Sequence, residues 1–285
     1  MKNCKMNKNR ILTLILLFAL SGCLVACGSG GSGSSDDSKG TTEKSSEDYF
    51  EWEDNIIVGL TKDGAAQKKL VIPERCEGFD ALLFSQYADI ESVAEEVSFE
   101  SDKNIELSNV FLGSAHVKKI TLPAELENIR AMEFQNCESL EAIVIPKNIS
   151  AIEDYAFEGN TSLETVTFEG DMVTNIGAQA FSRCEALTDI ELPDSVTTIG
   201  EYAFFECAAL EVIKLPKSLS SIAGFTFAVN GIVDVYIDAE TEFTSYDTTS
   251  FTQADHTVNI HVEEGSWADV NFDIVFDGAY ERVYQ

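Results

Sequence analysis

Histidine, the side chain that most often acts as a general base or a metal ligand, occurs only three times in these 285 residues. His116, His256 and His261 lie in different segments, and neither the histidines nor the cysteines have the spacing of zinc ligands. The glycine-rich residues 28–33 contain no Gly-Lys-Ser, and the sequence has no Gly-x-Ser-x-Gly elbow. We therefore expect no catalytic residue, no metal and no cofactor.

Carboxylates, in contrast, are abundant: 49 acidic residues against 19 basic ones give a formal net charge of −30. The adjacent acids at 36–37 and 263–264 could bind calcium, but neither pair has the Asp-x-Asp-x-Asp-Gly spacing of a calcium loop. We interpret both pairs as solvated charges. A field of this sign repels a phosphate backbone, which argues against nucleic acid as a partner.

The N-terminus has the pattern of an export signal. Four basic residues precede the apolar run Ile11–Leu20, and small residues follow it. A membrane-spanning helix is the alternative, but the run stops short of the roughly 20 apolar residues that cross a bilayer. The pattern therefore favours an exported chain.

Two segments at the end of this signal, residues 20–23 and 24–27, resemble the Leu-x-small-Cys lipobox of bacterial lipoproteins. The resemblance implies a lipid on Cys27, with Cys23 as the alternative; Cys27 is preferred because a polar stretch begins directly after it. Residues 1–26 would then be the lipoprotein signal peptide, and residues 27–48 a flexible Gly/Ser/acidic tether. The lipid would anchor the protein on the extracytoplasmic side of the bacterial cell membrane.

A period of about 23 residues governs the middle of the chain. Such a period indicates stacked units, because one unit of this length cannot bury its apolar residues alone. Apolar-x-apolar pairs such as Ile143 and Ile145 keep the same spacing. The clearest markers are six phenylalanines separated by 23, 23, 24, 23 and 23 residues: Phe111, Phe134, Phe157, Phe181, Phe204 and Phe227.

The clearest unit, residues 192–214, reads Leu-Pro-Asp-Ser-Val-Thr-Thr-Ile-Gly-Glu-Tyr-Ala-Phe-Phe-Glu-Cys-Ala-Ala-Leu-Glu-Val-Ile-Lys. It resembles the BspA-like leucine-rich repeat of bacterial surface proteins, Ile/Leu-Pro-x-Ser-Val-x-x-Ile-Gly-x-x-Ala-Phe-x-x-Cys-x-x-Leu-x-x-Ile. The resemblance covers residues 96–238 well and the flanks loosely. It fails at Glu133, where alanine usually precedes phenylalanine, at an extra residue near 170–171, and at residues 224–227.

The physical pattern supports the same architecture. Alternation puts Ile143 and Ile145 on one side of a short strand, and Pro146 ends that strand because proline has no N–H to donate. The expected fold is an α/β-type repeat solenoid that is mostly β. It would be a right-handed leucine-rich-repeat solenoid with a parallel β-sheet, coils of about 23 residues and capping ends.

The two ends depart from the period, as expected of segments that cover the open ends of a solenoid. We assign residues 49–95 to an N-terminal cap and degenerate repeat, residues 96–238 to the BspA-like repeats, and residues 239–285 to a C-terminal repeat and cap. Five apolar residues would cover the last coil: Trp267, Phe272, Ile274, Val275 and Phe276.

Three residues past each phenylalanine comes a small polar or thiol side chain, including Cys137, Asn160, Cys184 and Cys207. We interpret this column as turn residues with buried thiols rather than as a metal site or a disulfide ladder. Adjacent coils lie about 4.8 Å apart, so a bridge between Cys184 and Cys207 stays an alternative in an oxidising compartment.

The outward side chains of the predicted strands form two columns on the solvent face of the sheet. Solenoid sheets commonly bind partners on such a face, and its length suits a polypeptide or a glycan chain better than a small molecule. Tyr236 is the one obvious anchor type. The candidate binding residues are Thr121, Val144, Thr167, Asp189, Glu191, Lys214, Tyr236 and His261.

These features predict a non-catalytic, lipid-anchored surface module, a monomer, that binds an extracellular protein or glycan in recognition or adhesion. A structural or accessory protein of the cell envelope without a specific ligand is the alternative. A polysaccharide-acting enzyme is the least favoured function, because it needs carboxylates aligned across neighbouring coils. Positions 142, 165, 189 and 212 carry Ala, Thr, Asp and Val instead.

Overall fold

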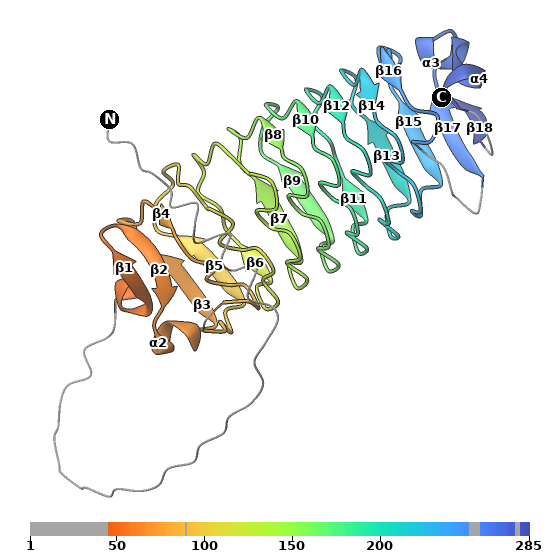
Figure 1. Cartoon of the computed structure of the whole chain (residues 1–285). Coiled ribbons are helices and arrows are strands. Elements are labelled where there is room, and N and C mark those ends of the chain that lie inside the picture. Colours follow the sequence, from red (N-terminus) through yellow and green to blue (C-terminus); the bar gives the residue numbers. More distant parts are fainter. Residues whose placement is uncertain (1–44, 89, 251–256, 277–279) are drawn as a thin grey trace, which may run out of the picture. The chain divides into compact units, whose positions relative to one another are not determined.

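The computed structural model describes residues 45–88, 90–250, 257–276 and 280–285. The predicted signal peptide, both lipidation candidates Cys23 and Cys27, most of the tether and His256 lie outside the described residues. These described residues form a mostly-β, parallel-sheet solenoid of about nine turns with about 23 residues per turn (Figure 1). The predicted fold class is confirmed.

Each coil contributes one strand to the same side of the stack, and a proline turn follows the strand in some coils, as at Pro146. These strands form two parallel sections, which we together call the long sheet. Apolar residues alternate with outward ones, as in β7, where Ile143 and Ile145 are buried while Ala142 and Val144 are exposed. Six strands form the first section, in the order β11 (Asp189–Ile190), β9 (Thr165–Phe168), β7 (Ala142–Ile145), β6 (Lys119–Ile120), β5 (Glu96–Phe99) and β3 (Lys69–Ile72). Four form the second: β13 (Val212–Leu215), β15 (Asp234–Ile237), β17 (Val258–Val262) and β18 (Tyr280–Tyr284).

A second parallel sheet of two-residue strands lies along another edge of the coils (Figure 1). Its buried isoleucines pair directly, for example Ile152 with Ile176 and Ile176 with Ile199. The sequence does not predict this sheet, because a strand of two residues is too short to show an alternation. The strands are β8 (Ala151–Ile152), β10 (Asn175–Ile176), β12 (Thr198–Ile199), β14 (Ser221–Ile222) and β16 (Ser245–Tyr246).

The six phenylalanines form a continuous stack inside the coils. Neighbouring rings have centroids 5.1–5.4 Å apart and planes within 21° of each other. Phe84, which the period does not identify, extends the stack by lying 5.2 Å from Phe111. Each ring from Phe111 to Phe227 is almost completely buried.

The residues two before and two after each phenylalanine have left-handed backbone conformations. At the earlier position φ lies between 54° and 63°, and at the later position between 54° and 76°. Hydrogen bonds to the next coil hold this geometry: the N–H groups of Tyr155, Phe157 and Gly159 donate to carbonyls at 2.8–2.9 Å. The phenylalanine turns thus make a third ladder, which offsets the cost of about 1–2 kcal/mol per left-handed residue.

The cysteine column is buried beside this ladder. The Sγ atoms of Cys137, Cys184 and Cys207 donate to the carbonyl of the phenylalanine in the preceding coil, over 3.0, 3.3 and 3.2 Å. Burial raises the pKa of Cys137 and Cys207 to about 12 and that of Cys184 well above its usual value. The thiols are free, and no bridge joins Cys184 to Cys207 in the structure.

The N-terminal end differs from the coils. The 3-10 helix η1 (Ser46–Tyr49) leads into β1 (Phe50–Glu53) and β2 (Ile56–Leu60), an antiparallel hairpin that the sequence analysis does not identify. The short helix α2 (Lys62–Ala65) follows, and β4 (Gly78–Phe79) pairs in parallel with β2.

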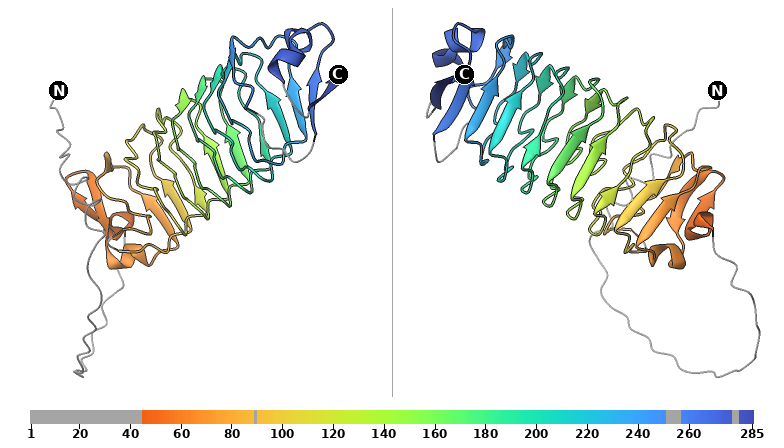
Figure 2. Two further views of the ribbon diagram at one scale, coloured as in Figure 1. Left: turned by 45° about the vertical axis from the view of Figure 1, so that its right-hand side comes forward. Right: turned by 180° about the vertical axis from the view of Figure 1, so that it is seen from behind.

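The C-terminal end carries the helices α3 (Trp267–Val270) and α4 (Phe272–Val275). Trp267 packs edge-on against Phe243 at 5.7 Å, and Phe272 and Phe276 belong to the core. Strand β18, which the sequence analysis does not predict, extends the sheet in parallel with β17 (Figure 2). None of the helices in the described residues is both long and apolar enough to cross a membrane.

We expect Phe181→Ala to destabilise the solenoid by about 3–5 kcal/mol, because the cavity would remove a ring stacked on both sides. Denaturant unfolding followed by circular dichroism measures the effect. The control is Met172→Ala, whose side chain is 54% exposed and whose loss should change the free energy of unfolding by well under 1 kcal/mol. If the two substitutions had equal effects on the free energy of unfolding, the claim that the phenylalanine stack stabilises the fold would be contradicted.

Candidate functional site

The outward positions of the long sheet place the predicted binding residues on one face. Parallel pairing aligns Val144 with Thr167, and Lys214 with Tyr236 and then His261. Asp189 aligns with Thr165 on the neighbouring strand. The remaining two predicted residues, Thr121 and Glu191, follow directly after β6 and β11.

The middle of this face is uncharged and exposed. Val144 is 46% exposed, and the other outward side chains around it are short or β-branched. Because three neighbouring strands fix these side chains, they need little ordering when a partner binds. We define the Thr/Val patch as Thr121, Ala142, Val144, Thr165 and Thr167, flanked by the charged residues Lys119, Asp189, Glu191 and Lys214.

In the C-terminal part of the face, polar side chains interact mainly with one another. The rings of Tyr236 and His261 stack at 4.1 Å, and Nε2 of His261 lies 2.7 Å from Oδ1 of Asp234. Nδ2 of Asn259 donates to the same oxygen over 3.0 Å. The hydrogen bonds from His261 and Asn259 lower the pKa of Asp234, so it carries a negative charge at neutral pH.

This network changes the interpretation of Tyr236, which the sequence analysis predicts to be an exposed anchor for a partner. The side chain is half-buried, and one face of its ring is covered by His261. The Asp234–His261 pair has the geometry of a catalytic dyad, but the described contacts of this imidazole are with Asp234 and the Tyr236 ring.

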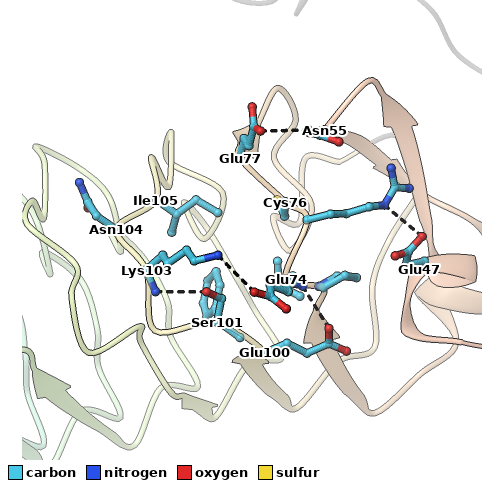
Figure 3. A pocket seen from close by; sticks show the side chains of 14 residues that line it. Glu47, Asn55, Glu74, Cys76, Glu77, Glu100, Ser101, Lys103, Asn104 and Ile105 are labelled. Carbon is cyan, nitrogen blue, oxygen red and sulfur yellow. Dashed lines mark hydrogen bonds and ion pairs between the residues drawn. The ribbon is translucent and has the colours of Figure 1, made fainter.

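A separate groove lies at the junction of the N-terminal end and the first coils, with a volume of about 690 Å³ (Figure 3). Both of its basic groups are paired: Arg75 Nε lies 3.0 Å from Glu47 Oε2, and Lys103 Nζ lies 3.2 Å from Glu74 Oε1. The Arg75 guanidinium also lies 3.6 Å from the centre of the Trp52 ring. These ion pairs hold the segments around the groove together, so we interpret the groove as a structural junction.

The thiol in this groove is not activated. Burial raises the pKa of Cys76, and its Sγ donates to the Gly78 carbonyl over 3.2 Å. A cysteine nucleophile needs the opposite shift, towards the thiolate. In the part of the chain that the structure describes, no three histidine, cysteine, aspartate or glutamate side chains are grouped to hold a metal ion.

The coil geometry and the repeat pattern together match one known family. The model of the BspA type leucine-rich repeat region, in six copies, matches residues 65–188 and 174–268. The chain belongs to the BspA-type leucine-rich repeat family. No curated protein matches the sequence.

Several solved structures are similar to this BspA-type chain. The T. pallidum leucine-rich repeat protein TpLRR is 23% identical, with a TM-score of 0.49, over 75% of this chain and 92% of that one. The pneumococcal vaccine antigen PcpA is 17% identical, with a TM-score of 0.41, over 76% and 68%. A leucine-rich cell surface protein of Faecalibacterium prausnitzii is 14% identical, with a TM-score of 0.37, over 75% and 79%.

One residue departs from the BspA-type pattern inside the core. Glu133 stands where the other coils have Ala156, Ala180 and Ala203, and it is 1% exposed. Its Oε1 accepts a hydrogen bond of 2.6 Å from the N–H of Asn109. Burial raises the pKa of Glu133 to about 7, and the contact with Asn109 opposes the rise. We interpret this carboxyl as a structural acceptor for a left-handed turn residue.

Glu133 should make the stability of the folded chain depend on pH. The folded pKa lies above the usual value of 4.5, so the folded state retains a proton that the unfolded state has lost. The free energy of unfolding should therefore fall by up to about 3 kcal/mol as the pH rises from about 4.5 to 7. Glu133→Gln should remove this part of the fall, as measured by denaturant unfolding between about pH 5 and pH 8. Identical pH profiles for the two proteins would contradict the interpretation.

Proposed function

We propose that this chain is a non-catalytic recognition module that acts outside the cytoplasm. It binds an extracellular polypeptide through the solvent face of the long sheet. The observation that carries the proposal is the Thr/Val patch: uncharged, exposed side chains held in register on three parallel strands. A rigid surface of this kind suits recognition, because it loses little conformational freedom on binding.

Chemistry on the face favours a polypeptide over a glycan. Sugar rings commonly stack on exposed aromatic rings, and among the outward positions of β5 to β17 the structure has only Tyr236 and the His261 imidazole. These two rings stack on each other. Val144 and the threonine methyl groups instead offer the apolar contacts that a polypeptide side chain can use.

The N-terminal sequence supports the location. An export signal followed by a lipobox and a polar tether would hold the repeats near the outer surface of the membrane. Membership of the BspA-type family agrees with a surface role. The lipid on Cys27, or on Cys23, is part of this proposal.

A structural role in the cell envelope is the second candidate function. The paired charges of the N-terminal groove and the closed Asp234–His261 network would then serve stability alone. This function requires no saturable binding to any soluble partner. It can therefore be separated from recognition by the same experiment.

The test is an array of extracellular proteins and glycans probed with the purified full chain. We expect saturable binding to a protein, and a loss of at least tenfold for the double variant Val144→Lys/Thr167→Lys, because two buried charges would replace apolar contacts at the centre of the face. Affinity is then measured for each hit in solution.

Met172→Lys is the matched control, because it adds a lysine at an exposed residue in the turn after β9 rather than on the sheet face. It should leave the affinity unchanged. A folded chain that binds nothing on the array would support the envelope role. A hit that the double variant binds as well as the natural chain would place recognition elsewhere on the molecule.

A further inference from the structure

Three aromatic rings gather on the phenylalanine turns, away from the sheet face. Tyr202 stacks on Phe225 in the next coil, with centroids 5.2 Å apart and planes 7° apart. Phe205 meets the same tyrosine edge-on, at 5.4 Å and 85°. We call Tyr202, Phe205 and Phe225 the aromatic cluster. All three side chains are partly exposed.

The aromatic cluster is not part of the hydrophobic core. Partly buried rings such as Phe168 and Trp267 pack against the core, whereas the three cluster rings pack against each other. The neighbouring Phe204 and Phe227 point inward and supply the buried stack. Core packing therefore does not explain why this surface carries three more rings.

The backbone conformation at two of these positions belongs to the repeat and does not require an aromatic side chain. Tyr202 and Phe225 have φ values of 56° and 55°, a conformation that glycine and asparagine adopt most easily. The same repeat position has this conformation in the other coils, where it carries Asn109, Met132, Tyr155 or Gln179. The presence of aromatic side chains at positions 202 and 225 therefore needs another explanation.

Acidic residues adjoin the aromatic cluster in the sequence and from the next coil. Glu201 is exposed beside Tyr202, and Glu206 follows Phe205 directly. The carboxylate of Asp247 reaches over Gly224 from the next coil, so that a Cβ atom at Gly224 would lie 3.2 Å from Asp247 Oδ2. Among the described residues, the basic group paired with one of these acids is Arg183, whose Nε lies 3.7 Å from Glu206 Oε2. These three acids and one base give the described part of this surface a negative net charge.

Exposed rings beside carboxylates suit a cationic side chain. A guanidinium or ammonium group is attracted to the face and π-electrons of an aromatic ring, and a nearby carboxylate can pair with the same cation. An anionic polymer would be repelled by this surface and by the net charge of the chain. A neutral glycan could stack on the rings and donate hydroxyl hydrogen bonds to the acids, but it has no positive charge to pair with them.

We propose that the aromatic cluster is a second docking surface, which binds an arginine- or lysine-containing segment of an extracellular polypeptide. It lies on the turns between the short strands and the following long strands, so it is separate from the sheet face. The proposal therefore does not depend on recognition through the Thr/Val patch.

The experiment measures binding of the purified full chain to a fluorescent peptide of alternating arginine and glycine. We expect Tyr202→Ala/Phe225→Ala to weaken binding by roughly fivefold or more, since two ring contacts with the cation are lost. Measurements at about 0.15 M ionic strength limit the contribution of distant carboxylates. A peptide with glutamate in place of arginine should not bind.

Tyr155→Ala is the matched control, because Tyr155 is a partly buried tyrosine with φ of 60° at the same position of another coil. It should leave the affinity unchanged, and Tyr202→Phe should retain binding because it keeps the ring. Circular dichroism checks that each variant is folded. If Tyr155→Ala weakens binding as much as the double variant, or if the double variant binds normally, the proposal is overturned. Stronger binding of a neutral chitin oligomer than of the arginine peptide would also overturn it.

Discussion

The contact between one coil and the next is the interaction on which everything else in this molecule depends. A coil of about 23 residues has isoleucines, leucines and a phenylalanine that it cannot cover by itself. Stacking buries them, and the rings of Phe134, Phe157 and Phe181 lie directly over one another with almost parallel planes. The same stacking forms the sheet hydrogen bonds and the ladder across the left-handed turns.

Stacking also explains the character of the surfaces. Because equivalent residues of successive coils lie side by side, any residue type repeated at one position becomes a column on the outside. The columns of the long sheet give an uncharged patch around Val144, bordered by charges. The columns of the phenylalanine turns give the aromatic cluster around Tyr202, bordered by carboxylates. Both surfaces are rigid, since the core beneath them sets their spacing.

Residue spacing alone predicts the inner part of this structure well. The period of Phe111 to Phe227 predicts the stack, and the alternation around Ile143 predicts which side chains face outward. It fails where the period breaks. Phe84 precedes Phe111 by 27 residues and still joins the stack, and β18 follows a segment with no repeat pattern.

Side-chain geometry is the other limit of sequence reasoning at the candidate site. Tyrosine is a residue type that often anchors a binding partner, but the neighbour of Tyr236 across the strands is His261, whose ring covers it. That contact depends on the rotamers of two residues 25 positions apart along the chain, which a spacing pattern does not contain. The left-handed conformation of Tyr202 is likewise visible only in the backbone.

Hydroxyl-radical footprinting of the chain, with and without a bound polypeptide partner, tests the central claim most directly, because it reports the solvent exposure of individual side chains. Val144 on the sheet face and Met172 in the turn after β9 are both well exposed in the free chain. Recognition through the sheet face predicts that the partner protects Val144 from oxidation and leaves Met172 unchanged. Unchanged oxidation of Val144 at saturating partner would contradict the account.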